Sequence, residues 1–580
     1  MVRVVGIAVS LGVLSCTGDG DGDGGPPADT DAPPTAICTE LTYQNFGQGF
    51  IHTWCLPCHT AELDEGDPRR QCAQPNVNFD TYAEVFALRT VIDRKVSGEV
   101  GGPPPETGGC SGQPIAPDCV CVEQSDMQMP PAGGVSEEDA ALLHEWVACD
   151  APGDPVPPPD CFTKSEHPGP VSLATQADAD AFCAGTANHI AGDLAISGSV
   201  SVDCLCSVDG AVAISGAAAD VSLPLLTSAG ALSAVGAVAL DRISAPNLRT
   251  LAMGDLELSA DPALSTLDLP WLTDVAGSAR LTDLAGLTDL PLGHLANLGG
   301  DLTVSGISAV TADLTRVRLV GGTLSVTDNA FLHDIDSLKS VYSIGGDLSV
   351  TGNPVLDSLR IGDVLEVIGG DILVSGNPSI TEINGFTLLP TANAVTVSDN
   401  DALESFDGFD LVLDVAAITV SDNANLSRVD AFRNVGAQPG YLATVVPDVV
   451  VARNPRLGFL SNFCATMPVA NSVLILGNGL GAIAQFDVLE QVVGDVTISE
   501  NPELDQINGL PELRFVGGSL TVDGNGTLAS LTGLGRLEQV GGNFAITDNP
   551  VLPTLQAQAL VDQVGAVNIG GTITVSGNQP

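Results

Sequence analysis

The stretch Leu348-Ser349-Val350-Thr351-Gly352-Asn353-Pro354 decides the fold of this chain. Its aliphatic residues Leu348 and Val350 alternate with hydroxyl residues, which predicts a β-strand with the aliphatic side chains pointing inward and the hydroxyl groups pointing outward. The Asn353-Pro354 pair predicts that the chain turns directly after the strand. We expect asparagines stacked inside such turns to satisfy buried backbone groups.

The same pattern returns at a nearly constant spacing, for example at Val496-Thr497-Ile498-Ser499 and Ile573-Thr574-Val575-Ser576. Less regular copies extend upstream to Leu194-Ala195-Ile196. One repeat cannot bury its own aliphatic face, so a period of 23–24 residues predicts stacked rungs with a continuous core. We assign residues 161–580 to this β-solenoid. The marker asparagines, separated by 24, 24, 23, 23, 31, 24, 23, 24, 24 and 29 residues, are Asn329, Asn353, Asn377, Asn400, Asn423, Asn454, Asn478, Asn501, Asn525, Asn549 and Asn578.

The repeat formula GG-DLxVxxNPxLxxL resembles the receptor L domain of growth-factor receptors, a leucine-rich-repeat-like β-helix. The segment from Thr175 to Cys183, followed by Ile190-Ala191-Gly192-Asp193-Leu194, is similar to the capped entry of such domains. The resemblance implies a long all-β right-handed solenoid. The resemblance says little about a ligand, because binding depends on the particular residues of a site and not on the fold that carries them.

Charge and composition exclude several partners. The chain has 580 residues, 20 Lys+Arg against 71 Asp+Glu, and a net charge of −51. Nucleic acid and anionic lipid both need clustered basic residues, so we expect neither as a ligand. Hydrophobic residues make up 44% of the chain but aromatic residues only 4%, so the core must consist mainly of aliphatic side chains.

Residues 1–16 have the layout of a secretory signal peptide. A small residue before Cys16 resembles a bacterial lipobox, which implies that Cys16 becomes the lipidated first residue of the mature chain; an ordinary signal with a chance cysteine is the alternative. Residues 17–37 are acidic and rich in Gly and Pro, which predicts an extended linker. The expected location is the outer membrane or cell surface through the lipid anchor, and the periplasmic side stays open.

Thirteen cysteines besides Cys16 fit an exported protein in which disulfides persist. Ten of them lie between Cys38 and Cys183, and the Pro-rich residues 151–160 predict a stiff linker between two domains. Cys38 and Cys149 flank the first domain, residues 38–150. Sequence does not reveal how the cysteines pair.

The motif Cys55-Leu56-Pro57-Cys58-His59 is the strongest chemical signal in residues 38–150. Two thiols two residues apart can bind both haem vinyl groups while the adjacent imidazole reaches the iron. A zinc half-site and a thioredoxin-like redox pair are the competing interpretations. No second CxxC completes a zinc site, and no βαβ pattern surrounds this one, so haem is favoured.

A methionine segment, Met127-Gln128-Met129-Pro130-Pro131, precedes an amphipathic run from Ala140 to Val147. With the CxxCH motif, residues 38–150 resemble a class I c-type cytochrome domain, in which a Met-Pro loop supplies the second axial ligand. The resemblance implies one haem c bound covalently by Cys55 and Cys58, with His59 and Met129 as axial ligands of the iron. Met127 is the alternative to Met129. A Pro/Gly-rich insert with four cysteines lies between the two motifs and departs from the family pattern, and we expect its cysteines to form disulfides that brace a long loop.

An enzymatic rod is disfavoured. Its outward strand positions are mostly Ser and Thr, and the three histidines of the array, His189, His294 and His333, are far apart, so we expect no Ser/His/Asp or metal set to converge. Acidic residues such as Asp399 and Asp422 precede the marker asparagines and raise the alternative of a calcium ladder, which we reject for a solvated turn. The longer steps predict loops at 434–442 and 555–564 that contact partners.

Two functions follow. The first is an exported, lipid-anchored mono-haem cytochrome that exchanges single electrons with a redox partner protein, the solenoid being its docking or recognition module. The second is a cell-surface recognition or adhesion lipoprotein whose solenoid binds an extracellular protein or glycan, the haem domain being accessory. Both describe an electron carrier or binding protein rather than a catalyst.

Overall fold

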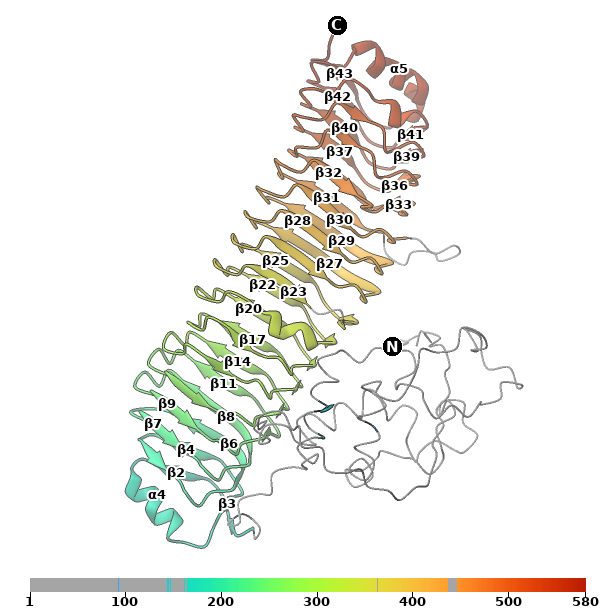
Figure 1. Cartoon of the computed structure of the whole chain (residues 1–580). Coiled ribbons are helices and arrows are strands. Elements are labelled where there is room, and N and C mark those ends of the chain that lie inside the picture. The colour runs from blue at the N-terminus through green and yellow to red at the C-terminus, as the bar shows by residue number, and fades with distance from the viewer. Residues whose placement is uncertain are drawn as a thin grey trace, which may run out of the picture. The chain divides into compact units, whose positions relative to one another are not determined.

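The computed structural model describes residues 161, 164–361, 364–436 and 446–580, together with Ile92, Leu143, His144 and Val147. The chain divides into two units, Met1–Pro157 and Pro158–Pro580. The second unit is a parallel β-solenoid of about 16 turns (Figure 1). The prediction of an all-β solenoid is therefore confirmed.

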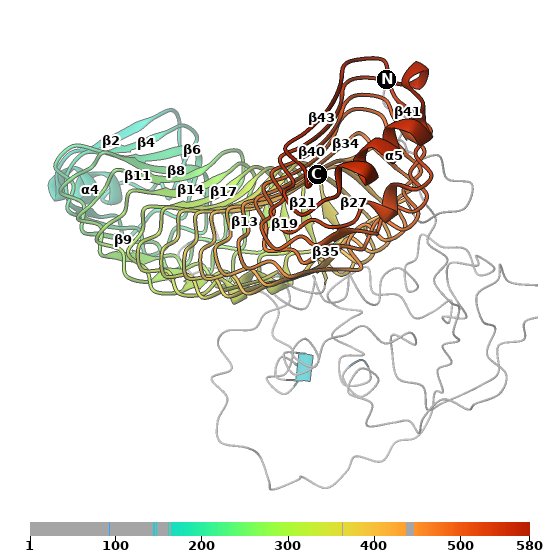
Figure 2. The same ribbon diagram turned by 90° about the horizontal axis from the view of Figure 1, so that it is seen from above.

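Each turn contributes strands to three sides of the solenoid, and every strand pairs in parallel with its neighbours one turn away; the register of β22 against β25, Leu348 to Ile372 and Val350 to Val374, is typical. The first two sides form one sheet that runs along the solenoid (Figures 1 and 2). Its strands are β1 (Glu166–His167), β2 (Val171–Leu173), β3 (His189–Ile190), β4 (Leu194–Ile196), β6 (Ser207–Ile214), β8 (Ser228–Val235), β10 (Thr250–Leu251), β11 (Leu256–Ser259), β13 (Asp274–Val275), β14 (Ala279–Thr282), β16 (Asn297–Leu298), β17 (Leu302–Ser305), β19 (Leu319–Val320), β20 (Leu324–Thr327), β21 (Ser343–Ile344), β22 (Leu348–Thr351), β24 (Val367–Ile368), β25 (Ile372–Ser375), β27 (Thr391–Ser398), β29 (Asp414–Ser421), β31 (Asp448–Ala452), β34 (Ser472–Leu476), β37 (Val496–Ser499), β40 (Leu520–Asp523), β42 (Phe544–Thr547) and β43 (Ile573–Ser576).

The remaining strands form shorter sheets. One continues the second side, and the others make up the third side. The continuation consists of β33 (Val469–Ala470), β36 (Gln491–Val492), β39 (Phe515–Val516) and β41 (Gln539–Val540). The third side consists of β5 (Val200–Ser201), β7 (Asp220–Ser222), β9 (Arg242–Ser244), β12 (Thr266–Asp268), β15 (Leu290–Pro291), β18 (Ala312–Asp313), β23 (Ser358–Ile361), β26 (Glu382–Gly385), β28 (Ser405–Gly408), β30 (Arg428–Ala431), β32 (Phe459–Ser461), β35 (Ala482–Ile483) and β38 (Gln506–Ile507).

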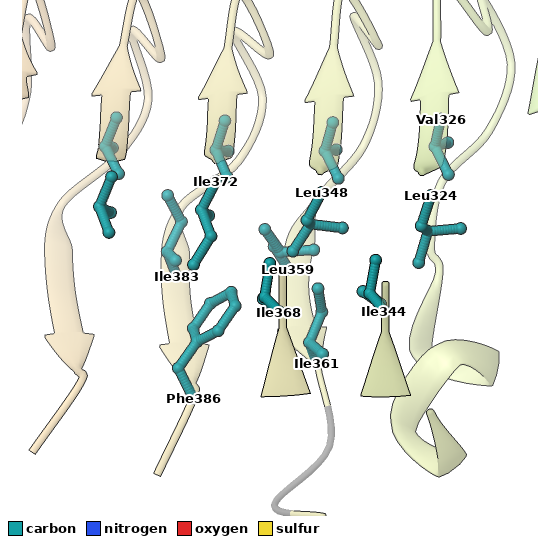
Figure 3. Close-up of a cluster of buried hydrophobic side chains, with 14 of the residues drawn as sticks. Leu324, Val326, Ile344, Leu348, Leu359, Ile361, Ile368, Ile372, Ile383 and Phe386 are labelled. Atoms are coloured by element: carbon teal, nitrogen blue, oxygen red, sulfur yellow. The ribbon is translucent and has the colours of Figure 1, made fainter. Parts of the chain in front are cut away.

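Aliphatic side chains from all three sides meet in one core. Leu348 and Val350 of β22 are fully buried, as the alternation in the sequence predicts. Figure 3 shows Leu348 and Ile372 facing Ile344 and Ile368 of the second side and residues such as Leu359 of the third. Because every rung contributes the same layers, the core is continuous along the axis, and each rung depends mainly on its two neighbours.

The marker asparagines form a buried ladder along the first turn. Asn353 is fully buried; its backbone N–H donates to Oδ1 of Asn377 at 3.0 Å, and its Nδ2 donates to the carbonyl of Val326 at 2.9 Å. The same contacts recur along the array, for instance from Asn400 to Asn423. Each amide thus satisfies backbone groups that a turn inside the core would leave without partners. The expected role of the asparagines is confirmed.

A second ladder, which the sequence analysis did not foresee, follows the paired glycines. Asp347 Oδ1 accepts the backbone N–H of Asp371 at 2.8 Å, and Thr323 Oγ1 accepts that of Asp347 at 3.2 Å. The glycines are required because the turns stack closely here: a Cβ on Gly345 would lie 2.2 Å from the carbonyl oxygen of Gly321. The "GG-D" of the repeat is therefore the signature of a tight corner.

The residue before each ladder asparagine has a left-handed backbone, with φ of 55° at Asp399 and 68° at Gly352. Glycine adopts this conformation freely, and aspartate is one of the few other residues that tolerate it. This requirement explains why Gly and Asp fill most of the column, in which Arg453 and Glu500 are the other residues. Among the residues described, no group of three or more His, Cys, Asp or Glu side chains has the arrangement of a metal site.

The N-terminal end of the solenoid is closed by helix α4 (Gln176–Cys183) and two disulfides. Thr175 caps the helix, and Asp178 completes the capping box by accepting the Thr175 backbone N–H at 2.8 Å. The Thr175 hydroxyl, followed by the backbone N–H groups of Ala174 and Thr175, holds the pKa of Asp178 below its usual value. Cys183 is bonded to Cys204, and Cys161 to Cys206.

The C-terminal rungs carry a helix where the sequence analysis expected a loop. Residues 554–564 form α5 (Thr554–Val564), which packs Ala557, Leu560 and Val564 against the end of the core. The prediction of a partner-binding loop at 555–564 is therefore wrong in structure: the extra residues cover apolar surface. The short 3-10 helices are η4 (Asp336–Ser340), η5 (Thr532–Leu534) and η6 (Ala566–Asn568). Neither described α-helix has the length and apolar character of a membrane-spanning segment.

Candidate functional site

The residues expected to bind haem and lipid lie outside the described part of the chain. This applies to the cofactor residues Cys55 and Cys58, to the axial ligands His59 and Met129 with the alternative Met127, and to Cys16. Residues 437–445, most of the other expected contact loop, lie outside it as well. The sites that the structure describes therefore belong to the solenoid.

One expectation about the solenoid is wrong. His189 converges with a serine and an aspartate: its Nδ1 lies 2.7 Å from Ser207 Oγ, and its Nε2 lies 3.1 Å from Asp209 Oδ2. The sequence analysis missed this set because β3 and β6 pair His189 with Ser207 across 18 residues. The imidazole is only 1% exposed. Both its nitrogens are occupied by these partners, so the set joins two rungs beside the Cys161–Cys206 disulfide.

A group of ion-paired side chains lies on the five-stranded sheet of the third side, whose strand order is β23-β26-β28-β30-β32. Alternate residues such as Phe406 and Val429 are buried. Their neighbours point outward, and Arg428 of β30 lies opposite Phe459 of β32. The Phe459 side chain is 71% exposed on the last strand of this sheet.

Aromatic residues form the support of this sheet. Phe386 stacks on Phe409 with ring centroids 4.4 Å apart, and Phe409 stacks on Phe432 at 4.9 Å. All three are buried and have a left-handed backbone, with φ between 55° and 62°. Bulky residues rarely adopt this conformation, which costs on the order of 1–3 kcal/mol each, so the surrounding packing must hold them in place. The sheet surface therefore rests on a tightly determined layer.

Beside this sheet lies a shallow depression of about 330 Å³, lined by Glu404, Asn425, Ser427 and Arg456. Arg456 Nη1 donates to Asn425 Oδ1 at 2.7 Å, which fixes the guanidinium over the amide. The Ser427 hydroxyl donates to the carbonyl of Glu404 at 3.0 Å. Within the described part of the chain, the Glu404 carboxylate makes no hydrogen bond or ion pair and is exposed to solvent.

Glycines keep the depression open on the side of Phe459. Gly458 directly precedes Phe459, and its backbone N–H donates to the carbonyl of Ser427 at 3.1 Å. A Cβ at Gly458 would have no atom within 4 Å, and the same holds at Gly481 in the following turn. The rungs with Glu404 and Ser427 carry side chains at this position, so the two glycines hollow the surface next to the exposed ring.

Ion pairs neutralise part of the negative charge around the depression. Arg453 binds Asp422 through two hydrogen bonds of 2.6 Å. The Arg453 guanidinium holds the pKa of Asp422 below its usual value. Arg428 similarly binds Asp407 at 2.8 Å. In this patch four arginines face six carboxylates, namely Arg428, Arg433, Arg453 and Arg456 against Asp399, Glu404, Asp407, Asp410, Asp422 and Asp430.

The sequence itself carries a signal of this site in its few basic residues. Four of the 20 basic residues fall between Arg428 and Arg456, in a strongly acidic chain. The rung Asn454-Pro455-Arg456-Leu457-Gly458-Phe459 departs from the repeat by placing an aromatic residue at an outward position. No protein family model matches the chain, and no curated protein is similar enough to count as a relative.

Proposed function

We propose that this chain is an exported, lipid-anchored protein that binds one haem c in residues 38–150 and carries single electrons. The observation that carries the proposal is the motif Cys55-Leu56-Pro57-Cys58-His59. The two thiols attach the haem, and His59 and Met129 ligate its iron, with Met127 as the alternative to Met129. The haem supplies a one-electron couple of its iron, so a redox partner protein must give or take the electron.

In this proposal the solenoid is the docking module, and its fold is the right-handed, receptor L-domain-like β-helix that the repeat formula implies. The anchor is a lipid on Cys16 at the outer membrane or cell surface. A rod of stacked rungs suits docking because the core of every turn already holds its surface in place. Such a surface loses little conformational entropy when a partner binds.

An absorption spectrum of the exported protein, oxidised and reduced, tests the haem. We expect reduced c-type bands in the wild type, loss of covalent haem in Cys55→Ser/Cys58→Ser, and loss of the sulfur-ligation signature in Met129→Ala. Met127→Ala is the matched comparison: an unchanged spectrum assigns the ligand to Met129, and loss of the signature in Met127→Ala instead assigns it to Met127. A folded, exported protein without haem would overturn the electron-carrier proposal.

A second function is favoured by the depression lined by Glu404, Asn425, Ser427 and Arg456. It lies beside the exposed aromatic ring of Phe459, and an exposed ring next to polar groups is a feature of a recognition surface. In this alternative the solenoid binds an extracellular ligand, and the haem domain is accessory.

The two functions differ in whether binding to a cell surface needs the haem. If electron transfer is the function and the solenoid only docks the redox partner, substitutions in the depression leave the absorption spectrum and the reduction potential unchanged. If recognition is the function, the solenoid binds cell surfaces with or without haem. Binding assays with the wild type and the haem-free Cys55→Ser/Cys58→Ser variant separate them.

A further inference from the structure

We propose that the depression beside β30 and β32 binds a neutral glycan, with one sugar ring stacked on Phe459. The inference rests on the recognition role described above and specifies its ligand class. It is carried by the polar groups that line the depression, by the aromatic ring next to it and by the charge balance around it.

The lining offers hydrogen-bond donors and acceptors together. The Arg456 guanidinium has N–H groups left after it binds Asn425, and the Asn425 amide has two N–H donors. The Glu404 carboxylate only accepts and has no partner among the described residues. Sugar hydroxyl groups are both donors and acceptors, so adjacent hydroxyls can bind the guanidinium and the carboxylate at once.

The exposed ring provides the apolar contact. Phe459 is 71% exposed and follows Gly458, whose N–H binds the backbone of Ser427 in the depression. The C–H face of a pyranose is apolar, whereas its hydroxyl groups point outward from the ring edge. A ring of this kind can cover Phe459 while its hydroxyls reach Ser427 and Arg456, and Gly458 and Gly481 leave the space.

Charge disfavours an acidic ligand. Three of the four arginines in the patch are already paired with aspartates, so little positive charge is left to attract an anion. The whole chain carries a net charge of −51, which repels polyanions over a Debye length. An acidic polysaccharide or acidic peptide would gain one contact with Arg456 and face this repulsion. A hydroxyl-rich ligand without charge faces none.

Calorimetry with the full exported protein and a defined panel tests the inference. The probes are cellohexaose, chitohexaose, maltohexaose and laminarihexaose as neutral glycans, and hexagalacturonate as the acidic one. We expect at least one neutral hexasaccharide to bind with a Kd below about 1 mM, and the acidic one not to bind. Binding to none of the neutral probes, or tighter binding of hexagalacturonate, would overturn the inference.

Substitutions locate the site. Phe459→Ala and Arg456→Gln should each weaken binding at least about tenfold, because they remove the stacking ring and the paired donor. The matched control is Phe515→Ala, which removes another partly exposed phenylalanine at the start of β39 and should change Kd less than about twofold. All three residues are on the surface, so the solenoid should keep its circular dichroism. If both site variants bind the glycan with the affinity of the wild type, the glycan binds elsewhere and the inference is contradicted.

A surface-binding assay separates this inference from the recognition function. Labelled protein is applied to intact bacterial and eukaryotic cells after periodate, which destroys glycans, or after protease. Loss of binding with periodate supports the inference. Loss of binding after protease treatment alone would support the recognition function with a protein ligand and would overturn the glycan inference. Binding to no surface would overturn both.

Discussion

In the four rungs directly before Asn329, the position of the ladder asparagine is occupied by Ala237, Asp261, Leu284 and Ile307, whereas the rungs from Asn329 to Asn549 place a fully buried amide there. The two regions share the left-handed residue before this position and the same aliphatic core. They differ in which side chains hydrogen-bond to the backbone N–H and C=O groups of the turn. The later rungs use side-chain amides, and the earlier rungs fill the space with apolar groups and one carboxylate.

The difference shows what the amide does beyond filling space. An asparagine accepts from the rung before it and donates to a carbonyl, so it completes two backbone groups with one side chain. Asp261 reproduces only half of this: its Oδ1 accepts the N–H of Ala237, but within the described residues its buried Oδ2 has no partner. Leu284 and Ile307 have no polar group for either task.

The largest expected effect comes from replacing a ladder asparagine by an apolar residue such as those of the earlier rungs. Asn400→Leu should destabilise the solenoid by about 4 kcal/mol, because Asn377 loses its acceptor and the carbonyl of Val374 loses its donor. Denaturant unfolding followed by circular dichroism measures the change. The control Asp401→Ala, at the exposed neighbouring position, should stay within about 0.5 kcal/mol. Equal stability of Asn400→Leu and wild type would mean that the ladder does not hold the turn.

A smaller effect is expected at the disulfide-closed end, where no amide ladder exists. Cys183→Ala/Cys204→Ala opens a loop with a sequence separation of 21 and should cost about 3 kcal/mol. Hydrogen exchange should show the loss in the rungs next to α4 and leave the rungs around Asn501 unchanged, since each rung depends mainly on its neighbours. Uniform loss along the whole solenoid would contradict this one-dimensional behaviour.

Completing the ladder should stabilise the earlier region. Burial without a partner for Oδ2 raises the pKa of Asp261 above its usual value, so its charged form is the costly one in the folded protein. The wild type should therefore lose stability as the pH rises from about 4 through the folded pKa. Asp261→Asn should add about 1–2 kcal/mol at neutral pH and remove this pH dependence. A destabilised Asp261→Asn would show that the carboxylate has a role the amide cannot take.

The smallest effect is expected at the surface pair in the column before the ladder. Arg453 lowers the pKa of Asp422, so this pair should add stability above the usual aspartate pKa and lose it as the pH falls through the folded value. Asp422→Asn should cost only about 0.5 kcal/mol, because the pair is partly exposed. High salt should abolish the difference between variant and wild type, and a difference that survives 1 M salt would mean that packing dominates.

Sequence alone predicted the features that repeat. The alternation at Leu348 and Val350 and the period of the asparagines are local patterns, and each rung restates them, so fold and core followed. Features that occur once were missed. Nothing local indicates that His189 meets Ser207 or that Cys161 bonds to Cys206, because each depends on contacts between distant residues. Residues 554–564 did carry a local signal, since Ala557, Leu560, Val561 and Val564 have helical spacing.

The candidate depression belongs to the same class of single features. Arg456, Gly458 and Phe459 are ordinary residues one by one, and their meaning comes from the rungs that pairing brings beside them. The expected haem ligands are the opposite case, since Cys55, Cys58 and His59 are adjacent in the chain and need no fold to be recognised.

Cys464 is a natural reporter of local opening in the interior of the solenoid. It is the free cysteine among the residues described; it is fully buried, and burial raises the pKa of its thiol, so it is unreactive while its rung is closed. A thiol reagent can label it only when neighbouring turns separate. The labelling rate therefore records how often the rod opens at its interior rather than at its ends, without any introduced probe.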